Sequence, residues 1–97
     1  MPPPSDPLHP LILVVDDAPD SIEPIVNCLH RAGFRTRIAT NGERALALAA
    51  SKPLPDLILL DISMPDRDGY EVCRQLMDDP LTASIPVIFL TIRNEEV

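Results

Sequence analysis

The sequence predicts a doubly wound parallel α/β sheet, and three observations lead to this prediction. Residues 11–15 and 57–60 are unbroken apolar runs, which are typical of strands that are covered on both faces. Both runs end abruptly on acidic residues. Segments with helical periodicity separate the strand-like segments, and this alternation is typical of parallel sheets with right-handed crossovers.

The first helix is expected soon after the first strand, which is Leu11 to Val15. Asp20 or Ser21 is the expected N-cap, because either side chain can accept a hydrogen bond from an unpaired amide of the first turn. Pro24 is expected in that first turn, where proline is tolerated, and Gly33 is the expected stop. The apolar residues of this segment recur at helical spacing: Ile22, Ile25, Val26 and Leu29.

The later elements are shorter. Residues 34–39 alternate between apolar and polar side chains, which favours a strand at the edge of the sheet. An alanine-rich helix is expected from Asn41 and Gly42 through Ala50, because prolines interrupt the chain beyond it. The third strand, the third helix and the fourth strand are expected at residues 57–60, 70–77 and 87–90.

Length and composition limit the domain count and the class of function. The 97 residues allow one domain, expected at residues 11–97, and five prolines among Met1 to Pro10 indicate a flexible tail. The net charge of −7 argues against direct nucleic-acid binding, which normally shows a basic face. No apolar run could span a bilayer and the first residues lack a secretory signal, so a cytoplasmic protein with no membrane partner is expected. Cys28 and Cys73 lack zinc-ligand spacing and are expected to be reduced, partly buried thiols.

Acidic residues follow two strands that are neighbours in the predicted sheet. Asp16 and Asp17 follow the first strand and Asp61 follows the third; ligands bind beyond the carboxyl ends of such strands. Three carboxylates so close together repel one another, so either one of them holds a proton or a cation lies among them. Mg²⁺ is the expected cation, because it accepts a few oxygen ligands and retains water, which leaves room for phosphate oxygens.

Asp61 is the expected nucleophile of a phosphoryl transfer. It stands alone at the end of its strand, whereas Asp16 and Asp17 form a pair that is suited to holding the metal. A single strand-end acid can instead cap the helix that follows it. That explanation is much weaker for three acids that converge on one edge of the sheet.

Three segments resemble the receiver domains of bacterial response regulators in two-component signalling. They are Leu-Val-Val-Asp-Asp at 13–17, Leu-Ile-Leu-Leu-Asp-Ile-Ser-Met-Pro-Asp-Arg-Asp-Gly at 57–69, and Ile-Pro-Val-Ile-Phe-Leu-Thr at 85–91. The match runs in order from Leu11 to the end of the chain. The resemblance implies a flavodoxin-like sheet of strand order 2-1-3-4-5, and only the first four of these strands are found here.

The resemblance also implies a role for each matching residue. Asp61 would be the phosphoacceptor, Asp17 a direct Mg²⁺ ligand, and Asp16 a ligand that acts mainly through water. Ser63 would offer its backbone carbonyl to the metal. Thr91 would be the switch hydroxyl, which moves to the phosphoryl group and carries the change to the far face of the domain.

The sequence departs from the family pattern in several places. The family has a lysine after a fifth strand, whereas the one lysine here is Lys52, near the end of the second helix, where it cannot serve. The fourth helix, the fifth strand and the fifth helix are not found either, so an incomplete receiver domain is expected. Ile92 follows the switch threonine, where the family usually has a small residue. Gly69, by contrast, matches the family and is expected to permit a positive backbone dihedral in the loop.

Partners follow from the same resemblance. A histidine kinase or a phosphotransfer protein would donate the phosphoryl group, and residues 56–80 look most like receivers fused to cyclic-dinucleotide enzymes or hybrid histidine kinases. The chain itself is expected to be no enzyme beyond accepting and losing its own phosphoryl group. The alternative is a non-phosphorylated pseudo-receiver that acts through protein contacts alone. Self-association is expected, either through the open edge of the strand at 87–90 and the face beside the first helix or by exchange of elements with a neighbouring chain.

Overall fold

A four-stranded parallel sheet organises residues 9–62, 64 and 66–90, the part of the chain that the structure, a computed structural model, describes. The strand order is β2-β1-β3-β4, which confirms the predicted flavodoxin-like receiver arrangement over these strands. The elements are β1 (Leu11–Val15), α1 (Pro19–Arg31), β2 (Arg35–Ala39), α2 (Gly42–Ala49), β3 (Leu57–Asp61), α3 (Gly69–Asp78) and β4 (Val87–Leu90).

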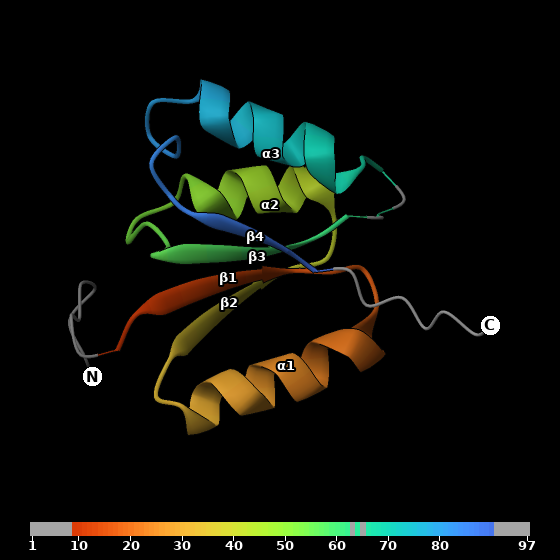
Figure 1. Cartoon of the computed structure of the whole chain (residues 1–97), viewed down its shortest axis with the longest axis vertical. Helices are drawn as coiled ribbons and strands as arrows, with labels where there is room; N and C mark the ends of the chain where they lie inside the picture. Colours follow the sequence, from red (N-terminus) through yellow and green to blue (C-terminus); the bar gives the residue numbers. More distant parts are fainter. Residues whose placement is uncertain (1–8, 63, 65, 91–97) are drawn as a thin grey trace.

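Helices cover both faces of the sheet. α1 lies on one face, and α2 and α3 lie beside each other on the opposite face (Figure 1). β1 pairs with β2 and β3, and β3 pairs with β4, always in parallel. β2 is therefore an edge strand, as its alternating sequence indicated.

β1 is the centre of the molecule. All five of its residues are buried, because the strand has a neighbour on each side and helices on each face. In the register of the sheet, Val15 lies opposite Ala39 of β2 and Leu60 of β3. The next residues along the two inner strands, Asp16 and Asp61, therefore come side by side at the carboxyl edge.

The main core lies between the sheet and the pair α2 and α3. The inward side chains of β1 and β3 meet small residues of α2 and branched residues of α3, so that the helices approach the sheet closely. The buried members are Leu13, Val15, Ala39, Ala45, Ala49, Ile58, Leu60, Val72 and Leu76.

The start of α1 differs from the prediction. The helix begins at Pro19, and its N-cap is Ala18, which makes no side-chain capping bond, so neither Asp20 nor Ser21 is the cap. Pro19 suits the first helical position because its missing N–H has no helical partner there and its φ is already helical. Pro24 consequently lies inside the helix and not in its first turn. Because proline has no N–H, the carbonyl of Asp20, four residues earlier, receives no helical hydrogen bond from Pro24.

The other helix ends follow the predicted signals closely. The second helix was expected to open at Asn41 and Gly42, and in the structure Asn41 caps α2 by accepting a hydrogen bond from the Arg44 amide at 2.8 Å. Asp68 caps α3 in the same way, so that helix begins at Gly69, one residue before the predicted start. Gly33 follows the end of α1 with φ of +92°, a left-handed conformation that glycine adopts without strain.

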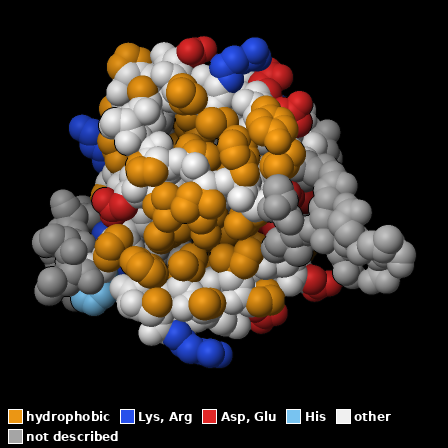
Figure 2. All heavy atoms as spheres, viewed as in Figure 1, with side chains coloured by type: hydrophobic (Ala, Val, Ile, Leu, Met, Phe, Trp, Pro, Cys, Tyr) orange, Lys and Arg blue, Asp and Glu red, His pale blue; other side chains and the backbone are white. Residues whose placement is uncertain are grey.

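The face under α1 is less completely covered than the opposite face. α1 is alone on it, and the side chains of β4 that alternate away from the main core point towards it. Ile88 is 51% exposed, and β4 has no further strand beside it in the described part of the chain. Figure 2 shows hydrophobic side chains gathered across the middle of this view, where β4 forms the near edge of the sheet.

The two cysteines are free thiols in different surroundings. Cys73 on α3 is half-buried, whereas Cys28 on α1 is exposed, so the expectation of partial burial is wrong for Cys28. Its position on the outer side of a helix that is covered on one side only explains the exposure. Among the helices described, none is both long and apolar enough to cross a bilayer.

Candidate functional site

Three acids meet at the carboxyl edge of the sheet, as the sequence predicted. Asp16, Asp17 and Asp61 each place one carboxylate oxygen so that the three oxygens lie within 4.8 Å of one another. Asp16 is buried, Asp17 is exposed and Asp61 is half-buried. The cluster is therefore rooted in the fold on one side and open to solvent on the other.

Backbone contacts fix the orientation of Asp16. Its Oδ1 accepts a hydrogen bond from the Ala18 amide at 3.0 Å, and its own amide donates to the carbonyl of Ala39 at 3.1 Å. The first contact forms a tight turn directly after β1 and the second continues the pairing with β2. These two bonds hold Asp16 in place. The turn that Asp16 forms with Ala18 leads directly into α1, which has no side-chain cap of its own.

The donor set of the cluster fits a hard divalent cation. Carboxylate oxygens are ligands that Mg²⁺ prefers, and a site with an open side lets the ion keep several waters. Three negative charges within this distance also repel one another unless a positive charge lies among them. The residues present therefore fit the Mg²⁺ site that the sequence predicted.

Gly69 allows α3 to start against the end of β3. A Cβ atom at Gly69 would lie 2.5 Å from the carbonyl oxygen of Asp61 and 2.7 Å from the Cα of Ile62, which no other residue could tolerate. The Gly69 amide donates to the carbonyl of Ile62 and closes the loop. Among the described residues only Gly33 has a positive φ, so the expectation of a positive dihedral at Gly69 is wrong. The glycine is needed for close approach instead.

Asp66, in the same loop, is a feature that the sequence analysis missed. Its carboxylate oxygens accept hydrogen bonds from the amides of Gly42 at 2.9 Å and Glu43 at 3.1 Å, the first two residues of α2. The Gly42 bond, helped by the Glu43 bond, holds the pKa of Asp66 below its ordinary value of 3.8, against an opposing effect of desolvation. The partners are 24 and 23 residues apart in the chain, so no local pattern could have revealed them.

The comparison with known families agrees with this geometry. Residues 12–97 match the family model described as the response regulator receiver domain. The chain belongs to this family.

Relatives and solved structures support the same assignment. A probable cyclic di-GMP phosphodiesterase of Vibrio cholerae is 48% identical over 80 residues, which cover 82% of this chain and 18% of that protein. The N-terminal domain of a response regulator receiver protein from Methanoculleus marisnigri is 41% identical with a TM-score of 0.82, over 90% of this chain and 70% of that one. The receiver domain of sensor histidine kinase PA1611 from Pseudomonas aeruginosa, solved with a magnesium ion coordinated in its active site cleft, is 30% identical with a TM-score of 0.81, over 86% and 67%. The receiver chain spans less than a fifth of the length of the first curated relatives that it matches.

The remaining predicted residues of the receiver site divide into two groups. Ser63, the expected carbonyl ligand, and Thr91, the expected switch, lie outside the described residues, as does Ile92. Lys52 is described, and it lies exposed in the connection between α2 and the start of β3. Because the acids lie at the other end of β3, a strand length of more than 10 Å separates that connection from the site.

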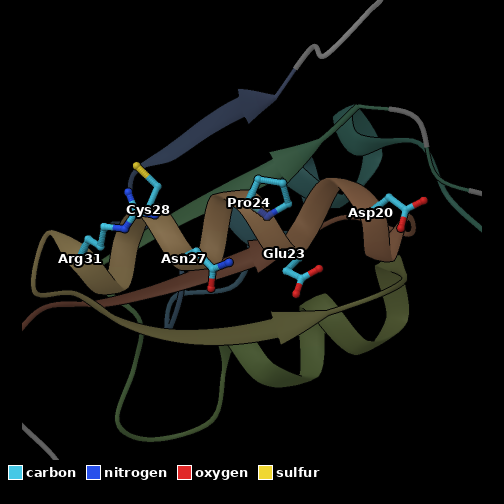
Figure 3. A pocket seen from close by; sticks show the side chains of 6 residues that line it. All are labelled: Asp20, Glu23, Pro24, Asn27, Cys28 and Arg31. Atoms are coloured by element: carbon cyan, nitrogen blue, oxygen red, sulfur yellow. The ribbon is translucent and has the colours of Figure 1, made fainter.

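A shallow hollow runs along the outside of α1, apart from the acids. All six side chains that line it come from α1, with Pro24 and Cys28 one turn apart on one side (Figure 3). Its lining contains none of the three clustered acids: it consists of Asp20, Glu23, Pro24, Asn27, Cys28 and Arg31. The acid cluster, and not this hollow, is therefore the candidate functional site of the receiver.

Proposed function

We propose that this receiver accepts a phosphoryl group on Asp61 from a histidine kinase or a phosphotransfer protein, with Mg²⁺ bound among the acids. The observation that supports the proposal is the convergence of Asp16, Asp17 and Asp61 within 4.8 Å at the edge where β1 and β3 end. Asp61 is the acceptor because it ends β3 and is only half-buried. The two acids after β1 are the metal holders.

The chemistry assigned to each residue is simple. A carboxylate oxygen of Asp61 forms a bond to phosphorus while the bond from phosphorus to the donor's histidine nitrogen breaks. Asp17 and Asp16 hold the metal, with Asp16 acting mainly through water, and the Ser63 carbonyl adds a further ligand. When bound there, Mg²⁺ neutralises charge on the transferring phosphoryl oxygens. Thr91 then carries the change in charge to the rest of the domain.

Labelling with acetyl phosphate tests the acceptor. In the presence of Mg²⁺ the chain should gain one phosphoryl group, which intact mass spectrometry detects, and Asp61→Asn should gain none. Asp20→Asn is the matched control, because Asp20 is an exposed acid of α1 outside the cluster. Labelling that persists in Asp61→Asn would reject the assignment. A chain that takes up neither phosphoryl group nor beryllofluoride would support the alternative, a pseudo-receiver that works by protein contact.

Titration calorimetry tests the metal site. Asp17→Ala should weaken Mg²⁺ binding by about a hundredfold, because an exposed ligand of a small, hard cation is lost. Asp20→Ala is the matched control, because Asp20 lies on α1 close in sequence but is not part of the cluster. Unchanged affinity in Asp17→Ala would contradict the proposed ligand set.

The place of the receiver in a pathway is part of the proposal. A cytoplasmic location suits a domain that receives its phosphoryl group from a kinase. A cyclic-dinucleotide enzyme or a histidine kinase is the proposed kind of output partner, since the similar proteins include a probable cyclic di-GMP phosphodiesterase and the receiver of a sensor histidine kinase. The chain would itself have no enzymatic activity beyond its own phosphorylation and dephosphorylation.

A further inference from the structure

The amino end of α2 is held by two side chains from different parts of the chain. Asn41, which immediately precedes the helix, accepts from the Arg44 amide at 2.8 Å. Asp66, from the loop between β3 and α3, accepts from the amides of Gly42 and Glu43 at 2.9 and 3.1 Å. The two caps take different amides, so α2 has a local cap of its own and a second cap that joins it to the acceptor loop.

The contact between the loop and α2 is close as well as polar. A Cβ atom at Gly42 would lie 3.0 Å from Cγ2 of Val72 and 3.2 Å from both Cβ and Cδ of Arg67. Gly42 is buried, so α2 presses on α3 and on the loop at the point where Asp66 reaches its amides. The carboxylate of Asp66 therefore binds the amino end of α2 at a place where α2 and the loop are already in close contact.

Both ends of the loop are also held. Asp61 pairs with Leu90 in the sheet at the beginning of the loop. At its end, the Gly69 amide donates to the carbonyl of Ile62, and Asp68 caps α3. Asp66 adds a third attachment between these two, to the amino end of α2.

We propose that Asp66 is a positioning residue for phosphoryl acceptance: its carboxylate fastens the acceptor loop to the amino end of α2 and thereby helps to hold Asp61 in place beside Asp16 and Asp17. The inference rests on the proposed function, because it assigns to Asp66 the support of the same metal site. Asp66 itself is no ligand and touches neither the metal nor the phosphoryl group. Without it, binding of the metal would have to order the loop, and affinity would fall by the cost of that ordering.

Two caps on one helix provide the matched pair of variants. Asp66→Ala removes the cap that reaches the loop, and Asn41→Ala removes the cap that does not. Both should lower the midpoint of urea unfolding, because each leaves amides of α2 without a partner. Only Asp66→Ala should weaken Mg²⁺ binding, by about tenfold, which is the effect of losing one interaction of helix-cap strength. Asp66→Asn, which keeps an oxygen acceptor, should recover part of the affinity and serves if Asp66→Ala does not fold.

A second measurement needs no metal. The Gly69 amide, which closes the loop, should exchange with deuterium faster in Asp66→Ala than in the parent chain, and at an unchanged rate in Asn41→Ala. Equal Mg²⁺ affinity in the parent chain and the Asp66 variants, or an equal loss in Asn41→Ala, would overturn the proposal and leave Asp66 as an ordinary cap. A parent chain that binds no Mg²⁺ would refute the proposed function, whereas the exchange of Gly69 would still decide whether Asp66 anchors the loop: unchanged exchange would overturn the anchor.

Discussion

The two faces of the sheet are built from the same strands but packed very differently. On the face under α2 and α3, the side chains of Leu13, Val15, Ile58 and Leu60 are all fully buried. On the face under α1, Ile12 and Val14 of β1 are buried, but Ile88 of β4 is 51% exposed. Among the described elements, α1 alone covers this face, and it leaves the β4 side of the sheet open.

This difference shows that the face under α2 and α3 holds the fold together, whereas the face under α1 leaves apolar surface exposed to solvent. The small residues of α2 and the branched residues of α3 pack against the sheet and exclude water, and burial of apolar area stabilises that layer. The α1 face stabilises mainly β1 and β2. Asp61 is attached to the well-packed layer through β3, and the loop after it is attached to α2 through Asp66.

The largest expected effect is on stability and compares the same substitution on each face. Ile58→Ala should lower the free energy of unfolding by about 2–5 kcal/mol, because Ile58 is fully buried and a cavity would remain. Ile88→Ala should cost about 1 kcal/mol or less, because half of that side chain is already in water. Urea unfolding followed by circular dichroism gives both values. Equal losses would mean that the two faces contribute alike.

An intermediate effect is expected on association of the 97-residue chain. Among the described strands β4 lies at an edge, and its Ile88 is exposed, so it is a surface on which a second copy can pair. Ile88→Lys should weaken self-association by about tenfold or more, as judged from the apolar area of one isoleucine. Ile38→Lys is the control, because Ile38 is 43% exposed on the opposite edge strand.

Light scattering across a dilution series measures both lysine variants. The contrast would be lost if Ile38→Lys dissociated the chain as strongly as Ile88→Lys. A parent chain that stays a compact monomer at micromolar concentration, unfolds cooperatively and binds no hydrophobic dye would show that the open face needs no partner.

The smallest expected effect is the pH dependence of the two hydrogen bonds that join Asp66 to the amino end of α2. Because the pKa of Asp66 is lowered in the folded chain, the stabilisation is present above its ordinary value of 3.8 and is lost as the pH falls through the lower folded value. The amide signals of Gly42 and Glu43 should therefore shift together in an NMR titration below about pH 4. The Arg44 amide is the internal control, since its acceptor Asn41 does not titrate. A simultaneous shift of Arg44 would point to general acid unfolding instead.

Strands and acids were predictable because their signals are local. The apolar runs that end at Asp16 and Asp61 specify two buried neighbouring strands, and their carboxyl ends must meet. The start of α1 was not predictable from capping preferences, because Asp16 accepts the Ala18 amide and Pro19 begins the helix without a side-chain cap. The attachment of Asp66 to α2 was hidden for another reason: it joins residues far apart in the chain, which only the packed structure brings together.

The central position of β1 has a consequence for the nascent chain during synthesis. β1 is made before the other elements of this sheet, but its inner neighbour β3 is made much later, since the Leu11 amide bonds to Asp56, 45 residues further on. At roughly 5–20 residues per second, ribosomes need about 2–9 seconds to make that stretch. During this interval the most apolar segment of the domain has only β2 and α1 to shield it. Asp16 and Asp17, directly after β1, stand where charged gatekeeper residues flank an apolar strand in natural sequences.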